Sequence, residues 1–270
     1  MCYSINMSIK KPEILFNYHT HTYRCGHAVG SDEDYVKAAI EGGYKVLGFS
    51  DHAPYRAQSK NTIRMDFEQF DGYLESINNL KEKYKDQIEI KIGLESEYIK
   101  EYLDEKKELR SKVDYLILGQ HYDKLEGGFF AFRHNSDEEI LRYANSVCEA
   151  IDSGLFTYLA HPDVIMVRQE EFNDACRQAA HIIGKKVEEK NFPVEINIRG
   201  VDSGKHEFPS GSFFYYPNKE FWTILAQYNI KAVIGMDVHN PEKLLDFKSV
   251  EDGLKELEGL NIKIIDKPFI

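Results

Sequence analysis

The sequence is poor in cysteine and proline and has no long apolar run. Only 4 of its 270 residues are cysteines and 8 are prolines, and no two cysteines form a C-x-x-C pair. A disulfide framework is therefore excluded, and free thiols fit a reducing compartment. No segment approaches the roughly 18 to 20 consecutive apolar residues of a membrane span, so we expect no membrane partner.

Basic residues are also in deficit. Lys and Arg number 34 against 45 Asp and Glu, which gives a formal net charge of -11 at pH 7. This balance argues against a nucleic-acid partner, because such binding draws much of its affinity from basic side chains on phosphates. A local basic pocket for one small phosphate is still compatible with it. Residues 1–11 lack the basic start and apolar stretch of a signal peptide, so we expect a cytoplasmic protein.

Short β-branched or aromatic runs alternate with longer amphipathic segments, a pattern typical of parallel βα units. No repeat or linker divides the chain, and an α/β barrel uses about 250 residues, so we expect one domain over residues 1–270. The strands are predicted at residues 14–18, 46–49, 88–93, 115–118, 157–159, 193–198, 232–234 and 263–265. The helices are predicted at residues 31–41, 66–84, 101–109, 136–153, 171–190, 218–228 and 249–257.

Two helix starts and one loop carry distinct signals. Ser31 with Asp34 and Ser136 with Glu139 have the spacing of capping boxes, which satisfy first-turn amides. Residues 200–217 form the most irregular stretch, with four consecutive aromatic residues at 213–216. Because long loops in compact domains are usually functional, we expect this one to lie over the site.

The predicted strands end in polar residues. Ligands of parallel α/β folds bind at the carboxyl ends of the strands, and residues i and i+2 of a strand project to the same side. The H-x-H and D-x-H pairs can therefore each chelate one ion, and imidazole with carboxylate favours Zn²⁺, Mn²⁺ or Fe²⁺ over Ca²⁺. The residues at these ends are His19, His21, Asp51, His52, Glu95, His121, His161, Asp237 and His239.

A single histidine is more often a hydrogen-bonded core or surface residue than a metal ligand. The whole set is different, because burying so many ionisable groups together without a cation would cost several kcal/mol per charge. A metal cluster resolves that conflict. His134, His181 and His206 lie outside the strand ends and are left out of it.

The motifs occur in the order of a known family. N-Y-H-T-H-T at 17–22, F-S-D-H-A-P at 49–54, I-G-L-E at 92–95, G-Q-H-Y at 119–122, A-H-P-D at 160–163 and G-M-D-V-H at 235–239 stand in sequence along the chain. In this the chain resembles the PHP (polymerase and histidinol phosphatase) family of metal-dependent phosphoesterases. The D-H-A-P element and E-I-N-I-R-G at 195–200 resemble its stand-alone histidinol-phosphatase branch.

The resemblance implies a distorted (β/α)7 TIM-like barrel, the PHP fold, with two or three divalent ions of Zn, Mn or Fe. Glu95 would bridge two of them. Cys25 or solvent is an alternative to one ligand, His27. By motif position the implied ligands are His19, His21, His27, His52, Glu95, His121, His161, Asp237 and His239.

The resemblance also implies a phosphate monoester hydrolase, and L-histidinol phosphate is the expected substrate. Attack in line by a metal-activated hydroxide needs no nucleophilic side chain, and the sequence has no G-x-S-x-G elbow. The catalytic candidates are Asp51, Asp237 and His239, with Asp51 orienting the His52 ring or protonating the leaving group. Arginine forks suit phosphate, and the candidates are Arg199, Arg168 and Arg64.

Other groups have weaker assignments. Glu195 and the aromatic residues 213–216 are available for the ammonium and imidazole of L-histidinol phosphate, although the aromatics can equally close the barrel mouth. Glu97 shares the strand face of Glu95 and is expected to be a structural partner rather than a ligand.

Three other functions compete with this one. An amidohydrolase barrel also begins with H-x-H, but it needs a bridging carboxylated lysine where this chain has Glu95. The same family includes phosphoesterases for other substrates, such as a nucleotide, a sugar phosphate or phosphotyrosine. A non-catalytic PHP module that binds a partner would be expected to have lost ligands, whereas all nine positions are filled. The oligomeric state is left open.

Overall fold

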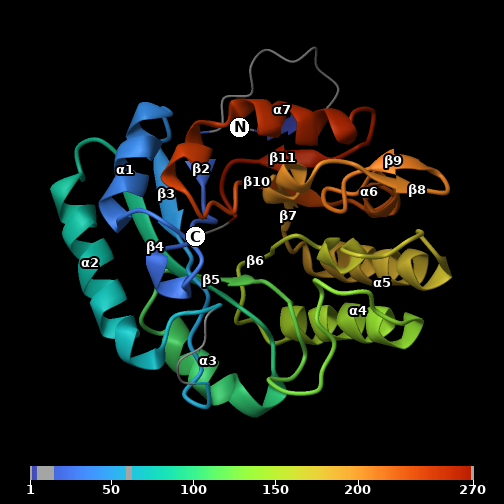
Figure 1. Cartoon of the computed structure of the whole chain (residues 1–270), viewed down its shortest axis with the longest axis horizontal. Helices are drawn as coiled ribbons and strands as arrows, with labels where there is room; N and C mark the ends of the chain where they lie inside the picture. Colours follow the sequence, from blue (N-terminus) through green and yellow to red (C-terminus); the bar gives the residue numbers. More distant parts are fainter. Residues whose placement is uncertain (1, 5–14, 59–62, 269–270) are drawn as a thin grey trace.

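The computed structural model describes residues 2–4, 15–58 and 63–268, and a sheet forms its centre (Figure 1). The strands of this sheet are β1 (Cys2–Ser4), β2 (Phe16–Asn17), β3 (Val46–Phe49), β4 (Glu89–Ser96), β5 (Tyr115–Leu118), β6 (Tyr158–Leu159), β7 (Val194–Asn197), β10 (Lys231–Gly235) and β11 (Lys263–Ile265). Their order in the nine-stranded sheet is β1-β11-β10-β7-β6-β5-β4-β3-β2. The eight predicted strands are confirmed, apart from residue 14, which lies outside the described residues.

The sheet closes on itself between β2 and β10. A parallel bridge joins Thr20 to Val238. Two backbone hydrogen bonds accompany it, from His21 N to the Val238 oxygen at 2.9 Å and from Val238 N to the His19 oxygen at 3.2 Å. Strands β2 to β7 and β10 therefore form a parallel ring, and β11 with antiparallel β1 extends beyond it. The predicted distorted seven-stranded barrel is confirmed.

The helices surround this ring (Figure 1). They are α1 (Asp32–Glu41), α2 (Phe70–Lys83), α3 (Leu103–Arg110), α4 (Asp137–Asp152), α5 (Asp174–Lys190), α6 (Lys219–Leu225) and α7 (Phe247–Glu256). Both predicted capping boxes, at Ser31 with Asp34 and at Ser136 with Glu139, are present. Among the helices in the described ranges, none has the length and apolar character needed to pass through a bilayer.

Large aromatic side chains fill the barrel interior below the strand ends. Alternate strand residues, including Tyr18, Tyr115 and Tyr158, form one buried cluster, and their neighbours on the strands pack outward against the helices. The Tyr115 hydroxyl donates to the Tyr18 carbonyl at 2.7 Å. A Cβ on Gly93 would lie 2.4 Å from the Tyr115 ring, so only glycine fits there. These aromatic side chains fill the middle of the barrel, so the polar residues lie at the carboxyl-terminal ends of the strands.

The segment 200–217 is more regular than expected. It contains most of the 3₁₀ helix η5 (Arg199–Ser203) and a hairpin of β8 (His206–Phe208) and β9 (Gly211–Phe213), so the prediction of one irregular loop is wrong. Its far end is fixed by Asp163, which accepts hydrogen bonds from Asn218 N at 2.6 Å and Trp222 Nε1 at 3.0 Å. Burial raises the pKa of Asp163 to about 7.

Candidate metal centre

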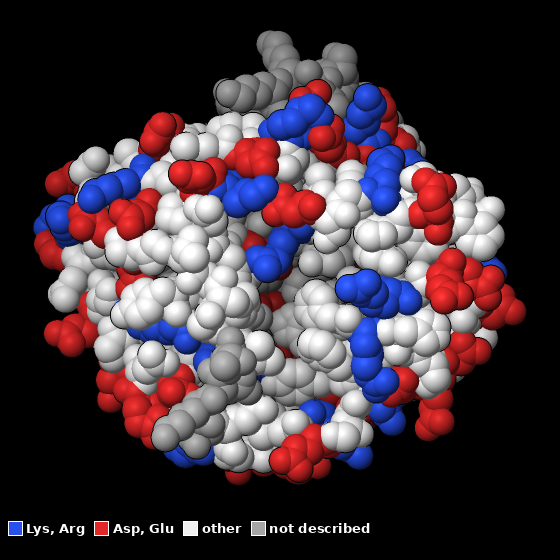
Figure 2. Space-filling model, viewed as in Figure 1, with Lys and Arg blue, Asp and Glu red and all other residues white. Residues whose placement is uncertain are grey.

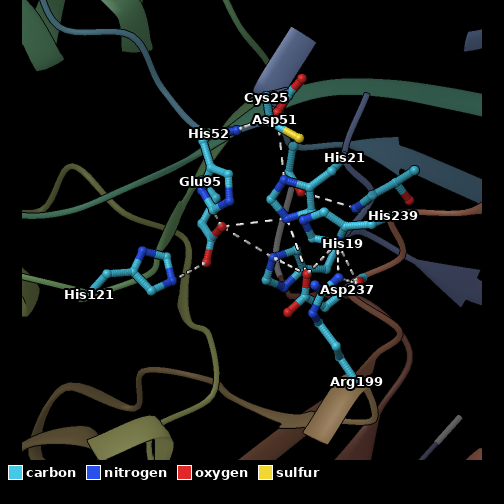
Figure 3. A network of polar contacts seen from close by, with 12 residues as sticks. His19, His21, Cys25, Asp51, His52, Glu95, His121, Arg199, Asp237 and His239 are labelled. Atoms are coloured by element: carbon cyan, nitrogen blue, oxygen red, sulfur yellow. Dashed lines mark hydrogen bonds and ion pairs between the residues drawn. The ribbon is translucent and has the colours of Figure 1, made fainter. Parts of the chain in front are cut away.

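Glu95, at the end of β4, lies at the centre of a ring of imidazoles (Figure 3). The side chain is 1% exposed, and both carboxylate oxygens face histidine nitrogens. The Oε2 atom lies 3.0 Å from His52 Nδ1, 3.5 Å from His19 Nε2 and 3.5 Å from His21 Nε2. The Oε1 atom lies 2.9 Å from His161 Nε2 and 3.4 Å from His121 Nε2.

Asp237 faces the same space from the opposite side, just after β10. Its Oδ1 atom lies 3.1 Å from His21 Nε2, 3.6 Å from His19 Nε2 and 3.4 Å from His239 Nδ1. The backbone φ is 47° at Asp237 and 27° at His161, in the left-handed region that non-glycine residues adopt only at a cost of about 1–3 kcal/mol. Two predicted metal ligands thus occupy strained positions, as is common where function fixes a side chain.

Hydrogen bonds behind the rings fix which nitrogen faces the centre. The Nδ1 atoms lie 2.9 Å from Glu195 Oε1 for His19, 3.0 Å from Glu97 Oε1 for His121, 3.0 Å from the Asp237 carbonyl for His239 and 3.0 Å from the Cys25 carbonyl for His27. An imidazole that donates through Nδ1 keeps its Nε2 lone pair free for a metal ion. The surroundings therefore prepare His19, His27 and His121 as Nε2 ligands, whereas the Nδ1 atom of His239 also contacts the guanidinium of Arg199, which can only donate.

Several buried polar atoms here have no hydrogen-bond partner within the described parts of the chain. They include His19 Nε2, His161 Nδ1 and His239 Nε2. Leaving such atoms unpaired would cost about 1–3 kcal/mol each, and a cation removes that cost. Candidate ligand atoms within 4.8 Å of one another occur in the groups His19-His21-Glu95, His19-His161-Asp237, His21-His52-His239 and Cys25-His27-His239. The site therefore fits divalent ions that take nitrogen and oxygen ligands.

The pKa values of the clustered carboxyls and imidazoles bear on metal binding as well. Burial opposes ionisation of Glu95 and Asp237, but the imidazoles around them, His121 and His19 above all, hold the pKa of both carboxyls well below the usual range. Burial lowers the pKa of His52 to about 3 and that of His239 well below its ordinary value. Burial opposes the charge of His19, His21 and His121 too, but the carboxylates around them raise the pKa of all three rings. Because ionised carboxylates and neutral imidazoles are the forms that bind metal, a bound ion would displace protons from these three rings.

The Asp51 carboxylate contacts a different histidine ring from the one expected. It is fully buried, and its carboxylate accepts hydrogen bonds from the hydroxyl of Thr22 and from His52 N, the latter at 2.8 Å. Its Oδ1 atom lies 3.5 Å from His21 Nδ1. The expectation that Asp51 orients the His52 ring is therefore wrong, because the ring it faces is that of His21.

Of the three candidate arginines, Arg199 borders the centre (Figure 3). Its Nη1 atom lies 3.4 Å from the Asp237 carbonyl and contacts His239 Nδ1. With Asp237, His239 and Tyr216 it lines a cavity of about 410 Å³. Arg168 is exposed and is not among the residues that line this cavity.

Arg64 is buried and already occupied. It donates to Glu97 Oε1 at 3.0 Å, to the Ala53 carbonyl at 2.8 Å and to the Tyr122 hydroxyl. The expectation of phosphate binding by Arg64 is therefore wrong. Since Glu97 Oε1 also lies 3.0 Å from His121 Nδ1, Arg64 supports the centre through Glu97, which is the structural partner expected from the sequence.

Glu195 is not available to a substrate, contrary to expectation. It is fully buried beneath His19, and its Oε2 atom accepts hydrogen bonds from His161 N at 3.2 Å and Asn197 Nδ2 at 2.8 Å. Asn197 also donates to Asp237 Oδ2 at 3.2 Å, a role that the sequence reasoning missed. The signal was present, since residues 195 and 197 share one face of β7.

Two glycines were also missed. A Cβ at Gly119 would lie 2.1 Å from Glu95 Oε1, and a Cβ at Gly235 would lie 1.7 Å from Glu195 Oε1. Each glycine therefore makes room for a carboxylate of the site. Glycine beside a polar strand end was the sequence signal for both.

Lys106 is a buried cation behind Glu97. Its Nζ atom lies 3.4 Å from the centre of the Tyr55 ring and has no hydrogen-bond partner within the described ranges. Burial lowers the pKa of Lys106 to about 7, from an ordinary value of 10.5. Between these two pH values the unfolded chain binds a proton that the folded chain does not, so folding carries a penalty that is complete near pH 7 and disappears toward pH 10.5.

We therefore expect Lys106→Met to raise the free energy of unfolding by about 2–4 kcal/mol near pH 7, with a smaller gain near pH 10. Urea denaturation at the two pH values measures it. Lys107→Met is the matched control, because the Lys107 side chain is 61% exposed and its replacement removes no such penalty. Equal gains at both pH values, or a loss of stability, would contradict the burial argument.

Comparisons with known proteins agree with this geometry. The sequence profile of the PHP domain family matches residues 17–199. A protein of Deinococcus radiodurans named a probable histidinol-phosphatase is 25% identical over 260 residues, covering 91% of this chain and 94% of that protein. The histidinol-phosphatase of Bacillus subtilis is 26% identical over 147 residues, 50% of this chain and 53% of that protein.

Among solved structures, the fold is similar to that of the histidinol phosphate phosphatase of Lactococcus lactis, crystallised with zinc, L-histidinol and phosphate. The TM-score is 0.68 at 19% sequence identity, and the match covers 92% of this chain and 95% of that one. This chain therefore shares its fold with that protein.

Proposed function

This chain belongs to the PHP domain family, and from that membership we propose that it is a metal-dependent phosphomonoesterase that hydrolyses L-histidinol phosphate to L-histidinol and phosphate. The observation that carries the proposal is the convergence of imidazoles on Glu95 and Asp237 beside the guanidinium of Arg199. Relatives named histidinol-phosphatases, one of them matched over nearly its whole length, support the substrate.

We propose that two or three ions of Zn, Mn or Fe bind at the nine residues His19, His21, His27, His52, Glu95, His121, His161, Asp237 and His239. Glu95 would bridge two of these ions; this is supported by its two oxygens, since Oε2 faces His19, His21 and His52 while Oε1 faces His121 and His161. His27 is exposed at the edge of the cavity and completes the set beside His239. When bound, such ions lower the pKa of water and neutralise charge on phosphoryl oxygens.

The side chains around the cavity hold the substrate and the attacking water. Arg199 offers a planar fork to two oxygens of the phosphate dianion. Asp237 and His239 border the same cavity, and we propose that they orient the water for attack in line with the leaving oxygen. Asp51 acts indirectly, because it orients the ring of the proposed ligand His21.

No covalent intermediate is needed in this proposal. Burial raises the pKa of Cys25 to about 12 and that of Cys148 and Cys176 to about 11, so none of these thiols is a ready nucleophile. All three are free cysteines, in keeping with the cytoplasmic location that we propose.

A substrate panel tests the proposal. Metal-loaded protein is incubated with L-histidinol phosphate, p-nitrophenyl phosphate, phosphotyrosine, a nucleoside monophosphate, a sugar phosphate and an amide analogue. We expect the highest kcat/KM for L-histidinol phosphate. Turnover of the amide alone would favour an amidohydrolase, and turnover of none by fully loaded protein would favour a non-catalytic module.

A further inference from the structure

The cavity beside Arg199 extends away from the candidate metal centre toward a second group of charges. Figure 2 shows this face of the molecule hollowed near its centre, with acidic and basic side chains in and around the hollow. The cavity lining includes Arg199 and Tyr216 together with Asp202, Lys243 and Asp246. A substrate whose phosphate binds at Arg199 therefore has its leaving group within reach of carboxylates.

Asp202 stands in a fixed relation to Arg199. Both belong to η5 (Arg199–Ser203), and residues three apart in a 3₁₀ helix lie on the same side, about 6 Å apart along the axis. Both side chains also line the same cavity, so a cation and a carboxylate face one space.

Asp246, which also lines the cavity, already accepts other hydrogen bonds. Asp246 caps α7, accepting from Ser249 N at 3.1 Å and from the Ser249 hydroxyl at 2.8 Å. The Asp202 side chain is 41% exposed, and its Oδ1 atom pairs with Lys243 Nζ at 2.6 Å. Lys243 is itself 42% exposed and lies 3.1 Å from Asp246 as well, so it can leave Asp202 without losing every partner.

We propose that Asp202 binds the amino group of the substrate, so that the enzyme selects phosphomonoesters that carry an ammonium close to the ester oxygen. The substrate ammonium takes the place that Lys243 Nζ occupies on Asp202. This inference rests on the proposed phosphomonoesterase activity and names the chemical class of its leaving group.

The test compares L-histidinol phosphate with the same ester lacking the amino group, 3-(imidazol-4-yl)propyl phosphate. Phosphate release gives kcat/KM for both esters, and the ratio between them measures amine recognition. We expect the wild-type ratio to favour the amino ester. Asp202→Asn should lower that ratio about tenfold, mainly through KM, as for the loss of one charged hydrogen bond.

Two further variants complete the design. Lys243→Met removes the internal competitor, so the KM for the amino ester should fall. Asp252→Asn, on α7 and outside the cavity lining, is the matched control and should leave the ratio at its wild-type value. Metal content and thermal midpoint are measured for each variant to exclude a general defect.

The outcomes are separable. Hydrolysis of both esters at equal kcat/KM, a ratio that Asp202→Asn does not change, or a KM that rises in Lys243→Met would each overturn the assignment of Asp202 while the phosphatase activity stands. Failure to hydrolyse any monoester, with metal bound, would instead overturn the proposed function and this inference with it.

Discussion

Replacing Glu95 by glutamine is expected to empty the metal centre and to lower kcat/KM for L-histidinol phosphate by about a thousandfold, or about 4 kcal/mol of transition-state stabilisation. Five imidazoles face the Glu95 carboxylate at 2.9 to 3.5 Å. The amide of glutamine keeps the shape but removes the charge and presents an N–H₂ group to one set of nitrogens. Metal analysis of the purified variant and phosphate release measure the two effects.

Glu89→Gln is the matched control for this variant. Glu89 begins the same strand, β4, but lies exposed at its other end and pairs with Lys91. Its replacement should leave both metal content and activity at wild-type values, because exposed ion pairs contribute little. A Glu95→Gln protein that kept its metal and its activity would contradict the placement of the centre around this carboxylate.

Replacing Arg199 by alanine is the second change with a large expected effect. The guanidinium is the charged fork beside the metal centre in the cavity, and the loss of such a donor from a phosphate typically costs about a hundredfold or more. We expect KM to rise and kcat/KM to fall by about that factor while the metal content stays at the wild-type level. Steady-state kinetics and metal analysis on the same preparation measure both.

Two companions sharpen the result. Arg199→Lys should recover part of the loss, since lysine restores the charge but not the two-pronged geometry. Arg177→Ala, on the exposed side of α5, controls for the loss of an arginine as such. Because Arg199 also contacts His239, a variant that loses metal would show that the arginine acts on the ligands and not on phosphate.

The positions of the strands and the convergence of the histidines and carboxylates at their ends followed from short-range patterns, whereas His27 was proposed only from the resemblance to the family. A strand alternates its side chains between two faces, so H-x-H and D-x-H pairs at the ends of successive parallel strands had to project into one space. His19, His21, Asp237 and His239 lie where that argument put them. The capping boxes are equally local, and both are present.

Depth within the barrel did not follow from the same pattern. Residues 195 and 197 lie two apart on β7, a step that advances about 6.6 Å along the strand, whereas Arg199 lies beyond the strand and begins η5. Glu195 therefore lies under His19, Asn197 reaches Asp237, and Arg199 reaches the cavity. The sheet face to which a side chain points was predictable from periodicity. Its position along the barrel axis depends on how neighbouring strands are staggered.

Side-chain partners that are distant in the sequence were the second feature that could not be predicted. Arg64 follows His52 closely in the chain, which made it a phosphate candidate, yet its partner Glu97 comes from a different strand end. Asp51 similarly faces His21 because β2 and β3 are neighbours in the ring. Such partners depend on which elements become adjacent, and that information is not contained in either local sequence.

The closure between β2 and β10 has a consequence for the mechanics of the fold. Thr20 and Val238 pair there, and Val238 makes two backbone hydrogen bonds, to His19 O and from His21 N, while His21 Nε2 and Asp237 Oδ1 lie 3.1 Å apart beside them. A cation bound by both side chains would cross-link β2 to β10, the two strands at which the barrel closes. Chelation would then loosen the cylinder at this join before any other part, with the amide of His21 among the first to exchange with solvent.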